Sequence, residues 1–165
     1  MVSKSSTKRS LVASASVGLV LMAALAAYAH SDEHKAHSEY ISGELGDPGK
    51  PFRVVELSMM DGNGTMAYAP AEVDVKKDEQ IKFVIKNSGT LDHEFFLDSF
   101  EKNAAHKIEM QKNPEMEHDD PNAVRLASGK QTEILWKFST AGTFEFACLI
   151  PGHYEAGMHG KVVVK

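Results

Sequence analysis

The stretch that decides the fold runs from Gly142 to Lys165 and reads GTFEFACLIPGHYEAGMHGKVVVK. It contains the single cysteine of the chain, Cys148, followed at intervals of five residues by His153 and Met158. Apolar residues alternate before Cys148 and again after Gly160, which predicts two β-strands joined by one loop that carries all three side chains. Thiolate, imidazole and thioether are the donors of a trigonal copper site with a weak axial methionine. The sequence therefore predicts a copper site in this loop.

The alternative is that the three side chains have ordinary roles, because single cysteines and methionines often fill a core and histidines often lie on surface loops. Three soft or borderline donors in one short loop favour the metal site. Pro151-Gly152 is expected to turn the loop so that His153 comes back toward the metal. A fourth ligand has to come from elsewhere. His93, in NSGTLDHEFFLD, is the best candidate because it shares one face of a predicted strand with apolar residues.

The first 29 residues have the pattern of a cleavable export signal. Lys4, Lys8 and Arg9 provide a basic start, residues 11–26 are apolar, and residues 27–29 read Ala-Tyr-Ala, a small-x-small cleavage site. An uncleaved membrane anchor is the alternative, but the alanine- and serine-rich core favours cleavage. We therefore expect residues 1–29 to be a signal peptide, and the mature protein to be periplasmic without stable membrane insertion.

The expected mature chain is acidic. The whole sequence has 18 Lys and Arg, 23 Asp and Glu, and a net charge of −5; the signal holds three of the basic residues and no acidic one, which leaves 15 against 23, a net charge of −8. Such a surface does not fit nucleic acid or anionic lipid as a partner. A single cysteine also excludes an internal disulfide, and copper binding would protect that thiolate in an oxidising compartment.

Residues 30–51 are expected to form a flexible arm and linker, because the segment is polar and then rich in glycine and proline. It contains His30, His34 and His37, which could bind a metal. A solvated tail that is histidine-rich by chance explains them equally well. The folded domain is expected at 52–165.

From residue 52 onward the pattern predicts about eight short strands. A hairpin is expected at Asp61-Gly-Asn-Gly, and Ile134, Trp136 and Phe138 share a face that should form the centre of the core. These features predict an all-β protein with a Greek-key β-sandwich. An immunoglobulin-type sandwich is the structural alternative, but it would normally pair two cysteines across its sheets.

One helical insertion interrupts the strands. Phe100, Ala104 and Ile108 recur at helical spacing, and the segment should stop at Asn113-Pro114. Further soft donors occur here, and with the arm histidines they are candidates for a second metal site: His106, Met110, Met116 and His118. The alternative is that the methionines fill gaps in the core.

A Cys-x4-His-x4-Met loop between strands, with an upstream histidine after an Asn-containing turn, resembles the cupredoxins, the type 1 copper proteins. The run MEHDDPN, followed by W-x-F and FEFACLIPGHYEAGM, resembles more narrowly the exported cupredoxins of bacterial copper tolerance. The similarity covers roughly Phe52 to Lys165. It implies one type 1 copper that cycles between Cu(I) and Cu(II), with His93, Cys148 and His153 in the trigonal plane and Met158 axial.

One residue departs from the pattern of the family. Many cupredoxins have a small polar residue directly after the upstream histidine, where it helps to tie the two ligand loops together, and this chain has Glu94. The hydrogen bonding around the thiolate is therefore not fixed by the resemblance.

The resemblance implies electron transfer to a transient redox partner, or contact with a copper-handling protein, together with a contribution to copper tolerance. A periplasmic copper buffer or chaperone without electron transfer is the alternative. Copper oxidoreductases that contain a type 1 centre, such as multicopper oxidases and copper nitrite reductases, connect it to a second copper through a histidine beside the cysteine. Here the neighbours of Cys148 are Ala147 and Leu149, so we expect no enzymatic activity.

Overall fold

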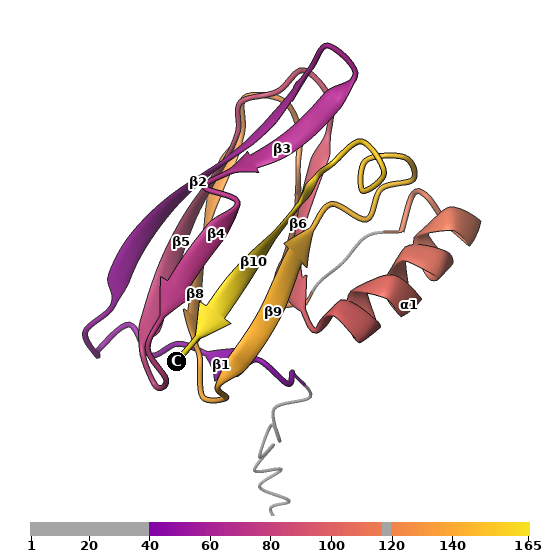
Figure 1. Ribbon diagram of the computed structural model, residues 1–165. Coiled ribbons are helices and arrows are strands. Elements are labelled where there is room, and N and C mark those ends of the chain that lie inside the picture. The colour runs from indigo at the N-terminus through magenta and orange to yellow at the C-terminus, as the bar shows by residue number, and fades with distance from the viewer. Residues whose placement is uncertain (1–39, 117–119) are drawn as a thin grey trace, which may run out of the picture. The chain divides into compact units, whose positions relative to one another are not determined.

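The computed structural model describes residues 40–116 and 120–165, which form two five-stranded sheets and one helix (Figure 1). The first sheet contains, in spatial order, β1 (Glu44–Leu45), β8 (Gln131–Lys137), β5 (Gln80–Asn87), β2 (Arg53–Gly62) and β3 (Thr65–Ala69). The second contains β4 (Glu72–Val75), β10 (His159–Val164), β9 (Gly142–Ala147), β6 (His93–Asp98) and β7 (Ala123–Leu126). The predicted Greek-key β-sandwich is confirmed.

The core lies between the two sheets and follows the alternation of the strands. In the β5–β8 pair, Ile81 lies opposite Trp136 and Phe83 lies opposite Ile134, all four side chains being buried. Phe138 is also fully buried, so the predicted core centre is confirmed. From the second sheet, the Phe95 and Phe146 rings complete the core in stacked contact, with centroids 5.6 Å apart.

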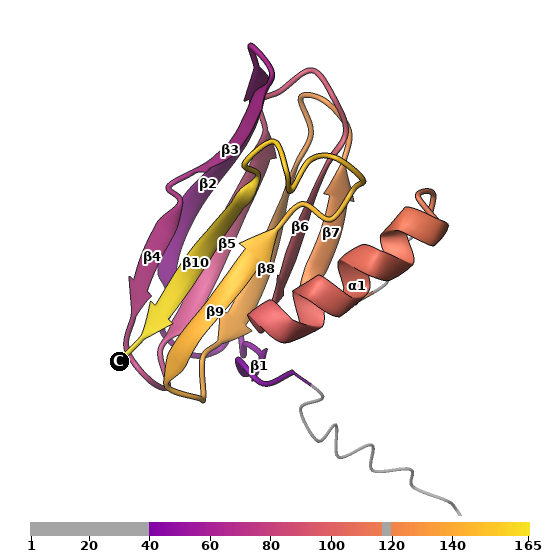
Figure 2. The same cartoon turned by 45° about the vertical axis from the view of Figure 1, so that its right-hand side comes forward.

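The insertion between β6 and β7 is the helix α1, Phe100–Lys112, as the spacing predicted (Figure 2). The Ser99 side chain caps its first turn by accepting a hydrogen bond from the Lys102 N–H at 3.2 Å. The apolar residues whose spacing predicted the helix do not lie on its buried face, since Phe100 is 48% exposed and Ile108 is 52% exposed. Within the described ranges, no helix is long and apolar enough to cross a membrane.

Asn103 and Met110 form the buried side of α1. The Asn103 amide donates to the main-chain oxygen and to Oε2 of Glu145 in β9, at 3.2 and 3.1 Å. A polar contact therefore helps to fix the helix to the second sheet, and hydrophobic spacing cannot reveal such a contact.

The segment Tyr40–Pro51 packs on the sandwich, which corrects the expectation of a flexible linker up to residue 51. β1 pairs with β8, and the Tyr40 ring meets the Trp136 ring edge-on at 5.3 Å between centroids. The Gln80 side chain accepts a hydrogen bond from the Asp47 N–H at 2.6 Å. The ordered domain thus begins before Phe52, whereas the expected signal peptide and the arm histidines lie outside the described residues.

Three connections meet at one end of the sandwich, and they position the candidate site. They are the β2–β3 hairpin, the loop between β5 and β6, and the long loop between β9 and β10 (Figures 1 and 2). Asp61 of the hairpin accepts hydrogen bonds from the second connection, and the Met66 N–H donates to the Ala156 oxygen of the third at 3.0 Å. The hairpin is therefore joined directly to both of the other connections.

Candidate metal centre

The structure brings together three of the four predicted ligands. His93 begins β6, Cys148 follows β9, and His153 lies in the loop after it. The Nδ1 atom of His153 lies 3.3 Å from His93 Nδ1 and 3.3 Å from Cys148 Sγ. In the part of the chain that the structure describes, this is the one group of three or more His, Cys, Asp or Glu side chains whose donor atoms all lie within 4.8 Å of one another.

The loop between β9 and β10 turns where the sequence predicted. The His153 N–H donates to the Ile150 oxygen at 3.0 Å, which closes a four-residue turn with Pro151 and Gly152 at its centre. Gly152 has a φ of +89°, the left-handed conformation that the third position of a type II turn requires. This turn returns the His153 ring toward the sulfur of Cys148.

Met158 closes the same loop. The Cys148 N–H donates to the Met158 oxygen at 3.0 Å, and the Met158 N–H donates to the His153 oxygen at 3.1 Å. The Met158 side chain is fully buried and belongs to the same core cluster as Cys148. Its thioether is therefore held in a dry environment on the loop that carries two of the other donors.

Glu94 ties the two ligand segments together. Its main-chain N–H donates to Cys148 Sγ at 3.3 Å, and its carboxylate Oε2 accepts from the Leu149 N–H at 3.2 Å. The Tyr68 hydroxyl, itself buried, donates to the Glu94 carbonyl oxygen. Although Glu94 departs from the usual small polar residue, it provides a link between the loops through a longer side chain.

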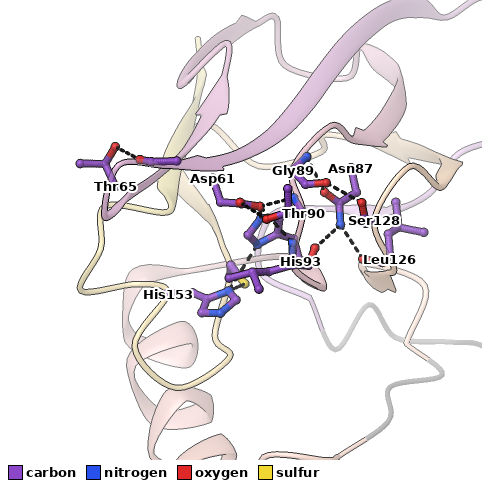
Figure 3. Close-up of polar contacts among 12 residues, drawn as sticks. Asp61, Thr65, Asn87, Gly89, Thr90, His93, Leu126, Ser128 and His153 are labelled. Carbon is purple, nitrogen blue, oxygen red and sulfur yellow. Dashed lines mark hydrogen bonds and ion pairs between the residues drawn. The ribbon is translucent and has the colours of Figure 1, made fainter.

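Asp61 is the residue that sequence reasoning missed at this site. Its Oδ2 atom lies 2.9 Å from His93 Nε2, on the side of the ring away from His153 (Figure 3). The sequence places Asp61 at the start of a hairpin turn, a common position for aspartate with no relation to a metal. Its contact with His93 spans 32 positions and two sheets, so no local signal indicates it.

Burial controls the protonation of the donors. It raises the pKa of the Cys148 thiol to about 12, and it lowers the pKa of His153. It also raises the pKa of the Glu94 carboxyl to about 7, whereas the hydrogen bond from the Thr90 side chain is the main reason that the pKa of Asp61 lies well below its usual range. In the metal-free protein a protonated Cys148 thiol therefore lies beside a neutral His153 ring. A thiophilic metal has to displace the thiol proton in order to bind.

The donor set fits copper. Two imidazole nitrogens and one sulfur, with His93 and Cys148 buried and His153 half-buried, are the donors of trigonal copper sites, and the buried thioether of Met158 on the same loop suits a weak further ligand. The turn at Pro151-Gly152 and the hydrogen bonds of Glu94 gather these donors, so the fold itself shapes the site.

The candidates for a second metal site are placed differently. His30, His34, His37 and His118 lie outside the described residues. Met110 is fully buried beside Phe96 and Leu149, and Met116 packs against the same cluster. The His106 ring stacks on Phe96, with centroids 4.6 Å apart. The two methionines therefore pack in the core, which is the alternative that the sequence left open for them.

A two-sheet sandwich with a His-Cys-His cluster at one end defines a cupredoxin. Residues 55–165 match the family described as copper binding proteins, plastocyanin/azurin family. The chain belongs to this family.

Its relatives include proteins named copper-resistant cuproprotein CopI. The one from Rubrivivax gelatinosus is 47% identical over 137 residues, covering 83% of this chain and 81% of the relative. The one from Vibrio cholerae is 32% identical over 148 residues, covering 80% and 86%. The chain is thus related to copper-resistance proteins.

Among solved structures, similarity extends to the auracyanins. Auracyanin from Roseiflexus castenholzii superposes with a TM-score of 0.57 at 24% identity, covering 70% of this chain and 99% of the other. Auracyanin B superposes with a TM-score of 0.59 at 22% identity, covering 76% and 96%. At these identities the similarity establishes the fold.

Proposed function

We propose that this protein binds one copper ion as a type 1 centre through His93, Cys148, His153 and Met158. The observation that carries the proposal is the convergence of His93, Cys148 and His153 within 4.8 Å at the end of a folded sandwich. Copper held there would supply reversible one-electron chemistry between Cu(I) and Cu(II).

The protein's own residues suit that chemistry by holding the donors in place. His93 and Cys148 are fully buried, and Cys148 is fixed by hydrogen bonds at its N–H and its sulfur. His153 is half-buried and follows the exposed Pro151 on the same turn. The His153 edge is therefore the place where an electron would pass to a transient partner, while the rest of the site is closed to water.

We further propose that the protein is exported to the periplasm and contributes to copper tolerance. The relatives named copper-resistant cuproprotein support this biological setting, and residues 1–29 support export through their signal-peptide pattern. The neighbours of Cys148, Ala147 and Leu149, offer no histidine to connect a second copper, which supports a role as a carrier without catalysis of its own.

Replacement of Cys148 with Ser tests the centre directly. Wild-type protein loaded with copper should contain one ion per chain and show thiolate-to-copper charge-transfer absorption, whereas Cys148→Ser should lose this absorption because a hydroxyl is a poor soft ligand. Metal analysis and the visible spectrum provide the measurement. Undiminished charge-transfer absorption in Cys148→Ser would refute the assignment.

A copper buffer is the second candidate function, favoured by the relatives' copper-resistance name. The two roles can be distinguished by complementing a deletion strain with Met158→Leu. This variant should keep copper but change its reduction potential. If the protein acts as an electron carrier, Met158→Leu should restore copper tolerance less well than wild type. If it acts as a buffer, Met158→Leu should restore tolerance fully and Cys148→Ser should not.

A further inference from the structure

The Asp61 carboxylate is held by three hydrogen bonds from the loop between β5 and β6. Oδ2 accepts from the N–H groups of Thr90 and Leu91 at 2.7 and 3.2 Å, and Oδ1 accepts from the Thr90 hydroxyl at 2.7 Å. Oδ2 also lies 2.9 Å from His93 Nε2, with 9% of the Asp61 side chain exposed and none of the His93 side chain. The carboxylate is therefore fixed in place before any metal is bound.

This contact determines the orientation and protonation of the His93 ring. An ionised carboxylate can only accept hydrogen bonds, so Nε2 of His93 has to carry the proton. The other nitrogen, Nδ1, then presents its lone pair on the side where His153 Nδ1 lies 3.3 Å away (Figure 3). Asp61 thus selects the tautomer that can bind a metal next to Cys148 and His153.

The surrounding backbone is shaped to allow this close contact. Gly89, in the loop between β5 and β6, packs directly against both partners. A Cβ atom at this position would lie 1.9 Å from Asp61 Oδ2 and 2.9 Å from His93 Nε2. Only glycine therefore leaves room for the carboxylate to reach the ring.

We propose that Asp61 is a positioning residue of the copper centre: it fixes His93 as the Nε2–H tautomer and makes Nδ1 a stronger donor to Cu(II). The inference rests on the proposed function, since it takes His93 as a ligand. Carboxylate partners of metal-bound histidines orient the ring and raise its basicity, and their loss typically weakens metal binding by about 10- to 100-fold. Because a more basic imidazole favours Cu(II) over Cu(I), Asp61 lowers the reduction potential.

The test compares Asp61→Ala and Asp61→Asn with wild-type protein. In metal-free samples, nitrogen NMR of His93 should show the Nε2–H tautomer in wild type and a mixture of tautomers in Asp61→Ala. In copper-loaded samples, we expect Asp61→Ala to bind Cu(II) about 10- to 100-fold more weakly. Asp61→Asn should raise the potential, by about 59 mV for each tenfold loss of Cu(II) affinity relative to Cu(I).

A control variant separates this role from general charge effects. Asp92→Asn removes a charge next to His93 from a side chain that is 51% exposed and pairs with Arg125 at 3.6 Å. This variant should keep the wild-type tautomer and potential.

The inference would be overturned by an unchanged His93 tautomer in Asp61→Ala, or by an unchanged potential in both Asp61 variants. It would also be overturned if Asp92→Asn shifted the potential as much as Asp61→Asn does, because the shift would then reflect the loss of any negative charge near His93. A wild-type protein that failed to bind copper would refute the proposed function instead, while the metal-free NMR comparison would still report on Asp61.

Discussion

The main-chain N–H of Glu94 donates a hydrogen bond to the Sγ atom of Cys148 at 3.3 Å, across 54 positions of sequence. The same residue accepts from the Leu149 N–H through its carboxylate. Glu94 therefore holds both the sulfur and the backbone next to it. This double link joins β6 to the start of the β9–β10 loop through contacts of the protein alone.

Glu94→Ala should weaken the metal-free fold. Removing the carboxylate leaves the buried Leu149 N–H without its acceptor, which costs about 1–3 kcal/mol. Urea unfolding of the metal-free protein measures the loss. Glu94→Gln is the matched control, since its amide oxygen can still accept the bond; an equal loss in Glu94→Gln would show that the link is not the cause.

Met158→Leu should retain copper and raise the reduction potential. The substitution conserves volume in the core, so we expect it to cost less than about 1.5 kcal/mol of stability. An axial thioether donates weakly to Cu(II), and its removal should raise the potential by about 60 mV or more, the equivalent of a tenfold change in relative affinity. Metal analysis and a redox titration check both points. Complete loss of copper would make methionine a principal ligand.

Asp98 should give the metal-free protein a pH-dependent stability. Burial raises the pKa of this carboxyl above its usual value of 3.8, so the native state keeps the proton to a higher pH than the unfolded chain does. The free energy of unfolding should therefore fall as pH rises from that usual value through the raised pKa. The fall amounts to about 1.4 kcal/mol for every tenfold difference in the acid dissociation constant between the folded and unfolded states.

Asp98→Asn isolates this contribution, because asparagine does not titrate and can still accept the Ser99 N–H, as Asp98 does at 2.7 Å. Denaturant unfolding of both proteins at a series of pH values gives the comparison. The variant should lack the part of the decline that Asp98 causes. Parallel curves for the two proteins would contradict the prediction.

The histidines of the arm should bind a second Cu(II). If the signal is cleaved after Ala29, His30 provides a free α-amino group and an imidazole, and His34 and His37 add further imidazoles. Binding should fail as pH falls through about 6.5, where protons compete for the nitrogens. Copper titration of mature wild type should therefore show one more ion than a variant with all three histidines changed to alanine.

His106→Ala is the control for this titration, because the ring of His106 stacks on Phe96 and should contribute no copper. Equal copper stoichiometry in wild type and the triple variant would rule the arm out as a binding site. Loss of an ion in His106→Ala would instead assign that ion to the helix.

The sequence predicted the sandwich, because the alternation of apolar and polar residues indicates which side chains face the interior. It also predicted that His93, Cys148 and His153 lie close together, because the short spacing between Cys148 and His153 places both at one loop. The role of Asp61 was not predictable, since its contact with His93 depends on how two sheets pack. The packed face of α1 was missed because Asn103, a polar residue, provides much of it. A two-residue strand such as β1 is also shorter than any periodicity can reveal.

The β2–β3 hairpin touches both segments that carry ligands: Asp61 contacts His93 at the start of β6, and the Met66 N–H donates to the Ala156 oxygen in the β9–β10 loop. Gly157 is also pressed against this hairpin, because a Cβ atom there would lie 3.1 Å from the Met66 oxygen. Two segments that share such contacts with one hairpin are constrained relative to each other. We therefore expect a displacement of the hairpin to shift His93 and the Cys148–Met158 loop in the same direction, so that the separation between them varies less than the position of either.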